Sequence, residues 1–429
     1  MVKFDWPDWK KIVLTRSGRR ARWIVGAAGL AVAGAISMWL HAGRAPPDLV
    51  GQFLATHWAQ PIAPQGEPPP GYTAIEASLA PETCAACHVA QFADLNGSLH
   101  SKAMGPGLLW QLRVMSQADG NDCLRCHAPL AEQKALTALE HGWANAPKSP
   151  LPAYVSADLH RRGNTCASCH VRRHQRLGPP SPLRNPKVHG GFEVQQAFRD
   201  SRFCSSCHQF PVGARSLEGK LIENTYEEWR SSPAAREGAT CQSCHMPNRR
   251  HLWRGIHDPE TVRKGLRREL EVRHLEGGRL NVIASISTPG VGHYFPTYVV
   301  PKVLVTLHLL SAGAEQEIAR LVIGRTVSVD MDREWSDTRI PPGGTSQLLA
   351  QVIEPSAAYR IEMRMEVVPG EHYARMYRTM MQRNPNLDKT TRTLLSEALT
   401  ETEAASYRLD DVVVEGPTAT GQIARAIAN

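Results

Sequence analysis

The chain has ten cysteines, and each of them belongs to one of five Cys-x-x-Cys-His boxes. The boxes are Cys84, Cys87 and His88; Cys123, Cys126 and His127; Cys166, Cys169 and His170; Cys204, Cys207 and His208; and Cys241, Cys244 and His245. The two thiols of such a box can form thioethers with one haem, and the adjoining imidazole can bind its iron. A disulfide framework or zinc knuckles would use the cysteines but would not explain the histidines. The boxes therefore predict five covalently bound haem c groups, with iron bound by the five box histidines.

The boxes recur at a short, nearly regular interval. They begin 39, 43, 38 and 37 residues apart. This spacing leaves room for a helix and a loop per haem but not for a separate apolar core around each one. We expect residues 80–276 to form a mainly helical, loop-rich domain in which the porphyrins supply much of the core.

The N-terminal segment predicts membrane attachment. Residues 1–22 carry seven Lys or Arg against two Asp, and the 18 residues from Trp23 to Leu40 carry no charge. This is the lower limit for a membrane span, and the basic flank favours a cytoplasmic N-terminus, so we expect a transmembrane anchor at 23–43. A cleaved signal peptide is the alternative, although the residues after Leu40 offer no good small-x-small cleavage site. Residues 44–79 are rich in proline and predict a periplasmic tether.

The pattern after residue 277 is that of strands. Residues 360–367 alternate between apolar and charged side chains, and residues 280–286 and 303–309 alternate similarly. Alternation of this kind describes strands with one buried face, so we expect a small antiparallel, sandwich-like sheet domain at 277–370. A helical tail is expected at 371–429.

A helix is also expected just before the sheet. Asp258 can cap its first turn and Pro259 suits the first helical position, and we expect the helix to continue to about Leu275. Together with the segments above, this predicts an α+β fold: a mainly helical multihaem domain, a β-domain, a helical tail and one N-terminal transmembrane helix.

The formal net charge of +8 does not predict nucleic-acid binding. Five haems would add about ten propionate carboxyls, which bring the loaded protein closer to neutrality. Membrane contact is expected through the anchor, and the remaining partners are expected to be redox proteins. The sequence makes no prediction of oligomeric state.

Four segments carry a resemblance to a known family. They are Gln91 to His100, Tyr226 to Met246, Gly255 to Asp258, and the run Gly-His-Tyr-Phe-Pro-Thr at 292–297. Over about residues 80 to 300 the chain resembles the multihaem superfamily that contains the tetrahaem cytochromes of nitrifiers and hydroxylamine-oxidoreductase-like proteins. The resemblance implies that His100, His257 and His293 are distal iron ligands.

Further histidines could supply the other second axial ligands. Eleven histidines after the tether lie outside the boxes. His174, four residues after a box histidine, and His189, in a Pro/Gly-rich loop, complete the expected set of distal ligands. His251 is the main rival to His257. A histidine outside the set is expected to be solvated or bonded to a propionate.

Two classes of function follow. The expected one is a membrane-anchored periplasmic cytochrome that relays electrons between a quinol-linked or cytochrome donor and a terminal oxidoreductase. The alternative is a reductase or oxidase of a small nitrogen or sulfur compound at a five-coordinate haem. All five boxes end in histidine rather than the lysine of pentahaem nitrite reductases, and spare histidines make full bis-histidine ligation feasible, so the sequence favours the carrier.

Overall fold

The computed structural model describes residues 46–180, 189, 191–416 and 423–428. The expected basic N-terminus and transmembrane anchor, residues 1–43, lie outside these residues. Within them, no helix combines the length and the apolar character that a membrane crossing requires. The chain divides into two compact units, 1–49 and 50–429, and apart from Leu49, the first residue of α2, the features that follow lie in the second unit.

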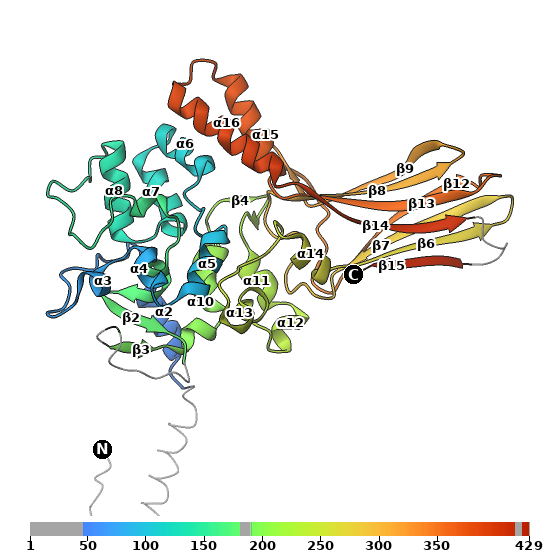
Figure 1. The fold of residues 1–429 in the computed structure, drawn as a ribbon. Coiled ribbons are helices and arrows are strands. Elements are labelled where there is room, and N and C mark those ends of the chain that lie inside the picture. The colour runs from blue at the N-terminus through green and yellow to red at the C-terminus, as the bar shows by residue number, and fades with distance from the viewer. Residues whose placement is uncertain (1–45, 181–188, 190, 417–422, 429) are drawn as a thin grey trace, which may run out of the picture. The chain divides into compact units, whose positions relative to one another are not determined.

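Short helices dominate the second unit up to residue 265 (Figure 1). They are α2 (Leu49–His57), α3 (Ala74–Ala77), α4 (Pro81–Ala85), α5 (Val89–Gly97), α6 (Pro106–Val114), α7 (Gln117–His127), α8 (Ala131–His141), α9 (Cys166–His170), α10 (Arg202–His208), α11 (Thr225–Arg230), α12 (Pro233–Arg236), α13 (Cys241–His245) and α14 (Pro259–Gly265). Short strands interrupt them: β1 (Val171–Arg172), β2 (Gln175–Gly178), β3 (Phe192–Val194), β4 (Ser216–Leu217) and β5 (Lys220–Leu221).

Four of the five boxes have a common local structure, and the first differs because α4 ends at Ala85, before its histidine. In α7, α9, α10 and α13 the box histidine is the last helical residue. Side-chain caps define the starts of two of these helices, because Ser116 accepts from the Asp119 amide and Thr240 accepts from the Ser243 amide. A box at the end of a helix presents its two cysteines and its histidine on one turn, which is the arrangement that one porphyrin needs.

Two antiparallel four-stranded sheets follow (Figure 1). Their orders are β12-β7-β6-β15 and β14-β13-β8-β9. The strands are β6 (Arg267–Leu275), β7 (Arg279–Ser287), β8 (Lys302–Ser311), β9 (Ala314–Ile323), β12 (Thr345–Ile353), β13 (Tyr359–Val368), β14 (Tyr407–Gly416) and β15 (Ile423–Ala428), with a separate ribbon of β10 (Arg325–Val327) and β11 (Glu334–Asp337). One hydrophobic core draws buried residues from both sheets, so the antiparallel sheets expected from the alternation are confirmed.

The helix expected before the sheet is shorter than predicted. The helix that begins at Pro259 ends at Gly265 rather than near Leu275. Residues 267–275 form β6 instead, where Leu270 and Val272 are buried opposite Ala284 and Val282 of β7. Tertiary pairing therefore overrides the local helical tendency of this segment. The glycine pair at 277–278, both with positive φ, is the turn between β6 and β7.

The C-terminal segment is only partly helical. Of the helical tail expected at 371–429, the helical part consists of α15 (Glu371–Arg383) and α16 (Lys389–Ala404). The chain then returns as β14 and β15, one at an edge of each sheet, which corrects the expected helical tail. The helical pair packs on α6 through Trp110, Tyr377 and Leu395, so it joins the helical region rather than extending into solvent.

A candidate multihaem centre

All five boxes open into one continuous cavity of about 3800 Å³, and every box cysteine and histidine lines it. Ordinary ligand pockets enclose about 300–1,000 Å³. All ten thiols are free of disulfides, as the haem interpretation requires. The cavity is therefore large enough for several porphyrins, and the residues that would attach them all face it.

The thiols show how the boxes are arranged. Cys84 interacts with Cys166, Cys126 with Cys207, and Cys204 with Cys241, each pair closely enough for a side-chain hydrogen bond to shift the thiol pKa values. The first box thus adjoins the third, and the fourth box adjoins both the second and the fifth.

The fourth box is the centre of this arrangement. Cys169 of the third box lies within electrostatic range of both Cys204 and Cys207. The boxes therefore connect as first to third to fourth, with the second and the fifth as two branches from the fourth. This branched order differs from the order along the chain.

Backbone hydrogen bonds orient three of the box imidazoles. The Nδ1 atoms of His127, His170 and His245 lie 2.8, 2.8 and 2.6 Å from the carbonyl oxygens of Ala103, Leu177 and Arg254. A carbonyl can only accept, so Nδ1 carries the proton and Nε2 keeps the lone pair that a metal needs. Burial lowers the pKa of His170 to about 4, which keeps the ring neutral at pH 7.

Four box imidazoles face a second imidazole across the cavity. Ring centroids are 6.1 Å apart for His88 and His189, 6.1 Å for His100 and His208, 6.1 Å for His170 and His251, and 6.3 Å for His245 and His293. Metal–imidazole nitrogen bonds are roughly 2 Å long and a centroid lies about 1.2 Å behind its nitrogen, so two ligands on opposite sides of one iron have centroids roughly 6.3 Å apart. The four separations fit one iron between each pair.

The His251 segment is held by a carboxylate from the first haem segment. Asp94 of α5 accepts from Nη2 and Nε of Arg250, at 2.5 and 2.7 Å, and from the His251 amide at 2.9 Å. His251 Nδ1 donates to the Arg249 carbonyl at 3.0 Å. Arg249 has a φ of 62°, an unfavourable conformation for a residue other than glycine. The Asp94 contacts stabilise this turn, which holds the His251 ring 6.1 Å from the ring of His170.

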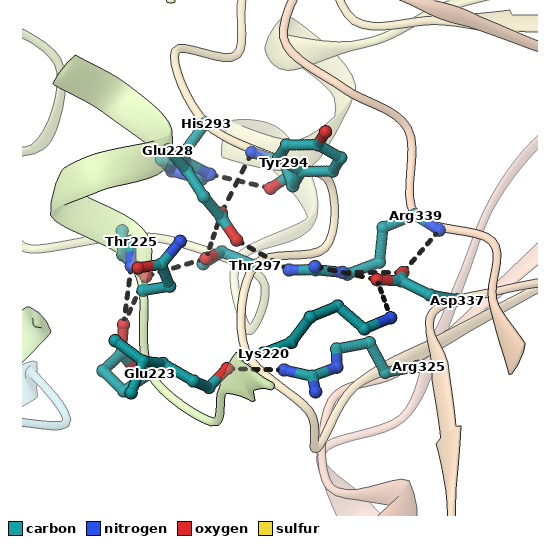
Figure 2. Close-up of polar contacts among 12 residues, drawn as sticks. Lys220, Glu223, Thr225, Glu228, His293, Tyr294, Thr297, Arg325, Asp337 and Arg339 are labelled. Atoms are coloured by element: carbon teal, nitrogen blue, oxygen red, sulfur yellow. Dashed lines mark hydrogen bonds and ion pairs between the residues drawn. The ribbon is translucent and has the colours of Figure 1, made fainter. Parts of the chain in front are cut away.

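The His293 segment is held by the helix α11 (Figure 2). Glu228 accepts from the Tyr294 amide at 3.2 Å and from the Thr297 hydroxyl at 2.9 Å. His293 Nδ1 lies 2.8 Å from the Tyr294 carbonyl, which again leaves Nε2 free. The loop after β7 is thereby fixed to the helical region at two points next to His293.

The other two expected distal ligands are placed differently. His174 is fully buried, and its Nε2 lies 3.1 Å from the Gly66 carbonyl. His257 lines the cavity, and burial lowers its pKa. Neither ring faces a box imidazole among the described residues, whereas the ring of His251 does.

His127 stands apart from the other box histidines. Across the part of the chain that the structure describes, no imidazole faces its ring. Tyr373 of α15 lies within electrostatic range of Cys123 in the same box, lines the cavity, and stacks on Tyr377 at 6.1 Å. Burial raises the pKa of Tyr373, so its hydroxyl stays protonated.

Several site residues could not be identified from the sequence. Asp94, Glu228 and Arg250 all support distal histidines, but each occupies a stretch with no metal-ligand spacing. Asp94 and Glu228 do fall inside segments that carry the family resemblance. That resemblance was the only feature of the sequence that pointed to them as site residues. Only the fold shows which histidine each carboxylate supports.

The helices, the continuous cavity and the five boxes that line it define the fold of a multihaem c-type cytochrome. A solved structure of a penta-haem cytochrome c552 from Thermochromatium tepidum matches with a TM-score of 0.57 at 16% sequence identity. The match covers 80% of this chain and 100% of that one. No protein-family model and no curated protein matches the chain. The resemblance to the nitrifier and hydroxylamine-oxidoreductase-like superfamily therefore stays a prediction.

Proposed function

We propose that the protein is a pentahaem cytochrome c that relays electrons between redox proteins. One observation carries this proposal: four box imidazoles each face a second imidazole, with ring centroids 6.1–6.3 Å apart. An iron held on both sides has no position for a substrate, and haem supplies one-electron oxidation and reduction. His189, His100, His251 and His293 are the proposed distal ligands for the first, fourth, third and fifth boxes.

The contact pattern of the boxes supports a relay. The fourth box adjoins the second, third and fifth, and the first adjoins the third, so no box is isolated. The chain's own contribution is to hold the box helices together and keep the distal histidines rigid. A quinol-linked or cytochrome donor and a terminal oxidoreductase remain the proposed partners.

Haem content and electron count test the proposal. Mass spectrometry of the acid-extracted protein is expected to show the polypeptide plus five haems. Stopped-flow mixing of the dithionite-reduced, desalted protein with oxidised mitochondrial cytochrome c, a generic one-electron acceptor, is expected to transfer five electrons per chain. Fewer covalent haems, or a fraction of the haems that cannot be reoxidised by the acceptor, would contradict the relay.

We also propose that the relay is anchored in the cytoplasmic membrane with its haem-binding region in the periplasm. The support is the basic flank of residues 1–22, the uncharged stretch Trp23 to Leu40, and the requirement that haem c is attached outside the cytoplasm. A reporter enzyme that is active only in the periplasm, fused after Arg44, should be active and membrane-bound. Release of a soluble form lacking residues 1–45 would identify a signal peptide instead.

A second candidate function rests on His127. If no residue completes the coordination of its iron, the second box provides a site for a small nitrogen or sulfur compound, beside the tyrosines of α15. Low-temperature EPR of the oxidised protein would then show one high-spin haem, and carbon monoxide would bind one haem in five after reduction. A spectrum with low-spin haems alone would exclude this function and leave the relay.

A further inference from the structure

The ligand loop at His293, the helical region and the β-domain meet at one buried carboxylate. Glu228 of α11 has a side chain that is 4% exposed, and it receives three hydrogen bonds. Two come from the His293 loop, through the Tyr294 amide and the Thr297 hydroxyl. The third comes from Arg339, which follows β11, at 2.7 Å. Figure 2 shows Glu228 between the loop and Arg339.

We infer that Glu228 and Arg339 are positioning residues that hold His293 at ligand distance from the haem of the fifth box. This inference rests on the proposed function, because it takes His293 as a distal ligand. It goes beyond that function by naming the groups that determine whether the ligand stays bound.

The helix α11 contacts the segment before the fifth box, the end of the fourth box and the His293 loop. Trp229 Nε1 donates to the Ala239 carbonyl at 3.1 Å, two residues before Cys241, and the Glu227 amide donates to Gln209, the residue after His208. The neighbouring side chain, Glu228, holds the His293 loop. One short helix thereby sets the separation between His245 on α13 and His293 opposite, which is 6.3 Å between ring centroids.

Arg339 stabilises the buried negative charge of Glu228. Its side chain is 8% exposed and pairs with Asp337 through Nε at 2.9 Å as well as with Glu228. The guanidinium also lies over the Tyr294 ring, 4.9 Å from its centroid, where a cation–π contact is favourable. Asp337 in turn pairs with Lys220 of β5 at 3.2 Å. A buried carboxylate without such a partner would be strongly destabilising, so the loop depends on the β-domain as well as on α11.

A matched set of variants separates positioning from general stability. Glu228→Gln keeps the size of the side chain but replaces one accepting oxygen with a donor, so at least one of its three donors loses its partner. Glu227→Gln is the control, because Glu227 lies on the same helix but forms an exposed ion pair with Arg230. Thr297→Val is a milder variant that removes the hydrogen bonds of the Thr297 hydroxyl to Glu228 and to the Thr225 hydroxyl and leaves the Glu228–Arg339 ion pair in place.

The readout is the spin state and potential of the haems in the full, loaded protein. Glu228→Gln should convert up to one additional haem per chain from low spin to high spin and raise its midpoint potential, and Thr297→Val should cause a smaller change in the same direction. Glu227→Gln should match the wild type. If Glu228→Gln and Thr297→Val keep the wild-type spin count and potentials, the inference is wrong. If Glu228→Gln does not fold, Thr297→Val alone decides.

His293→Ala separates the ligand role of His293 from the positioning role of Glu228. A loss of one low-spin haem in His293→Ala, without any change in Glu228→Gln or Thr297→Val, would retain His293 as a ligand and overturn only the positioning role. No change in His293→Ala would overturn the ligand assignment, and the positioning role with it.

Discussion

The His251 imidazole faces the His170 imidazole with ring centroids 6.1 Å apart. Trp253 packs its edge against His251 at 5.0 Å and against His100 at 4.7 Å, so one indole supports two of the proposed distal ligands. His257, which the family resemblance favoured, lies six residues further on and faces no box imidazole among the described residues. The geometry thus favours His251 as the ligand of the third box.

The two histidines can be separated by substitution. His251→Ala should leave all five haems attached, because the thioethers are untouched, and should convert one low-spin haem to high spin while raising its potential. His257→Ala is the control and should leave the EPR spectrum unchanged. The opposite result, a change in His257→Ala alone, would restore the assignment implied by the resemblance.

His293→Ala is expected to give the same class of change at a different haem. The fifth box would lose its distal imidazole, while the covalent haem count stays at five. Because His251 and His293 face different boxes, the double variant should show two additional high-spin haems rather than one. Quantitative EPR with spin integration measures this, and a non-additive count would mean that the two histidines do not serve separate haems.

The ring planes predict two kinds of low-spin spectrum. The planes of His245 and His293 are 10° apart, whereas those of His100 and His208 are 69° apart. Nearly parallel imidazole planes split the energies of the two iron dπ orbitals, whereas nearly perpendicular planes leave them almost equal. The haem of the fourth box should therefore have a larger g anisotropy than the haem of the fifth box. His100→Ala should remove that signal. If the signal persists, it belongs to another haem.

The stability of the β-domain should depend on one buried ion pair. Arg325 and Glu334 are 2.6 Å apart with side chains 1% and 3% exposed, and Arg325 also donates to the Leu221 carbonyl at 2.7 Å. Glu334→Gln leaves the guanidinium without its partner and should cost about 3–5 kcal/mol. Glu317→Gln breaks an exposed pair with Arg320 and should lower the stability far less, because solvent screens an exposed pair. Calorimetry compares the two, and equal losses would contradict this prediction.

The covalent chemistry was predictable from the sequence because it is local. Each haem attachment motif is complete within five consecutive residues, so the boxes could be counted without any tertiary information. The strands with alternating side chains, such as β13, were predictable for the same reason. Helix α14 was extended wrongly into β6, because the pairing of β6 with β7 on one side and with the distant β15 on the other does not show in the local pattern of residues 267–275.

The pairing of imidazoles and the order of the boxes depend on tertiary structure alone. A distal ligand has no motif of its own, because any histidine that the fold brings to the correct distance can bind. Asp94 directs His251, and Glu228 directs His293, through contacts between segments that are distant in sequence. The branched order of box contacts through the fourth box also differs from the order along the chain. The tertiary fold decides which helices ending in Cys-x-x-Cys-His lie next to one another, and the sequence alone does not show which ones those are.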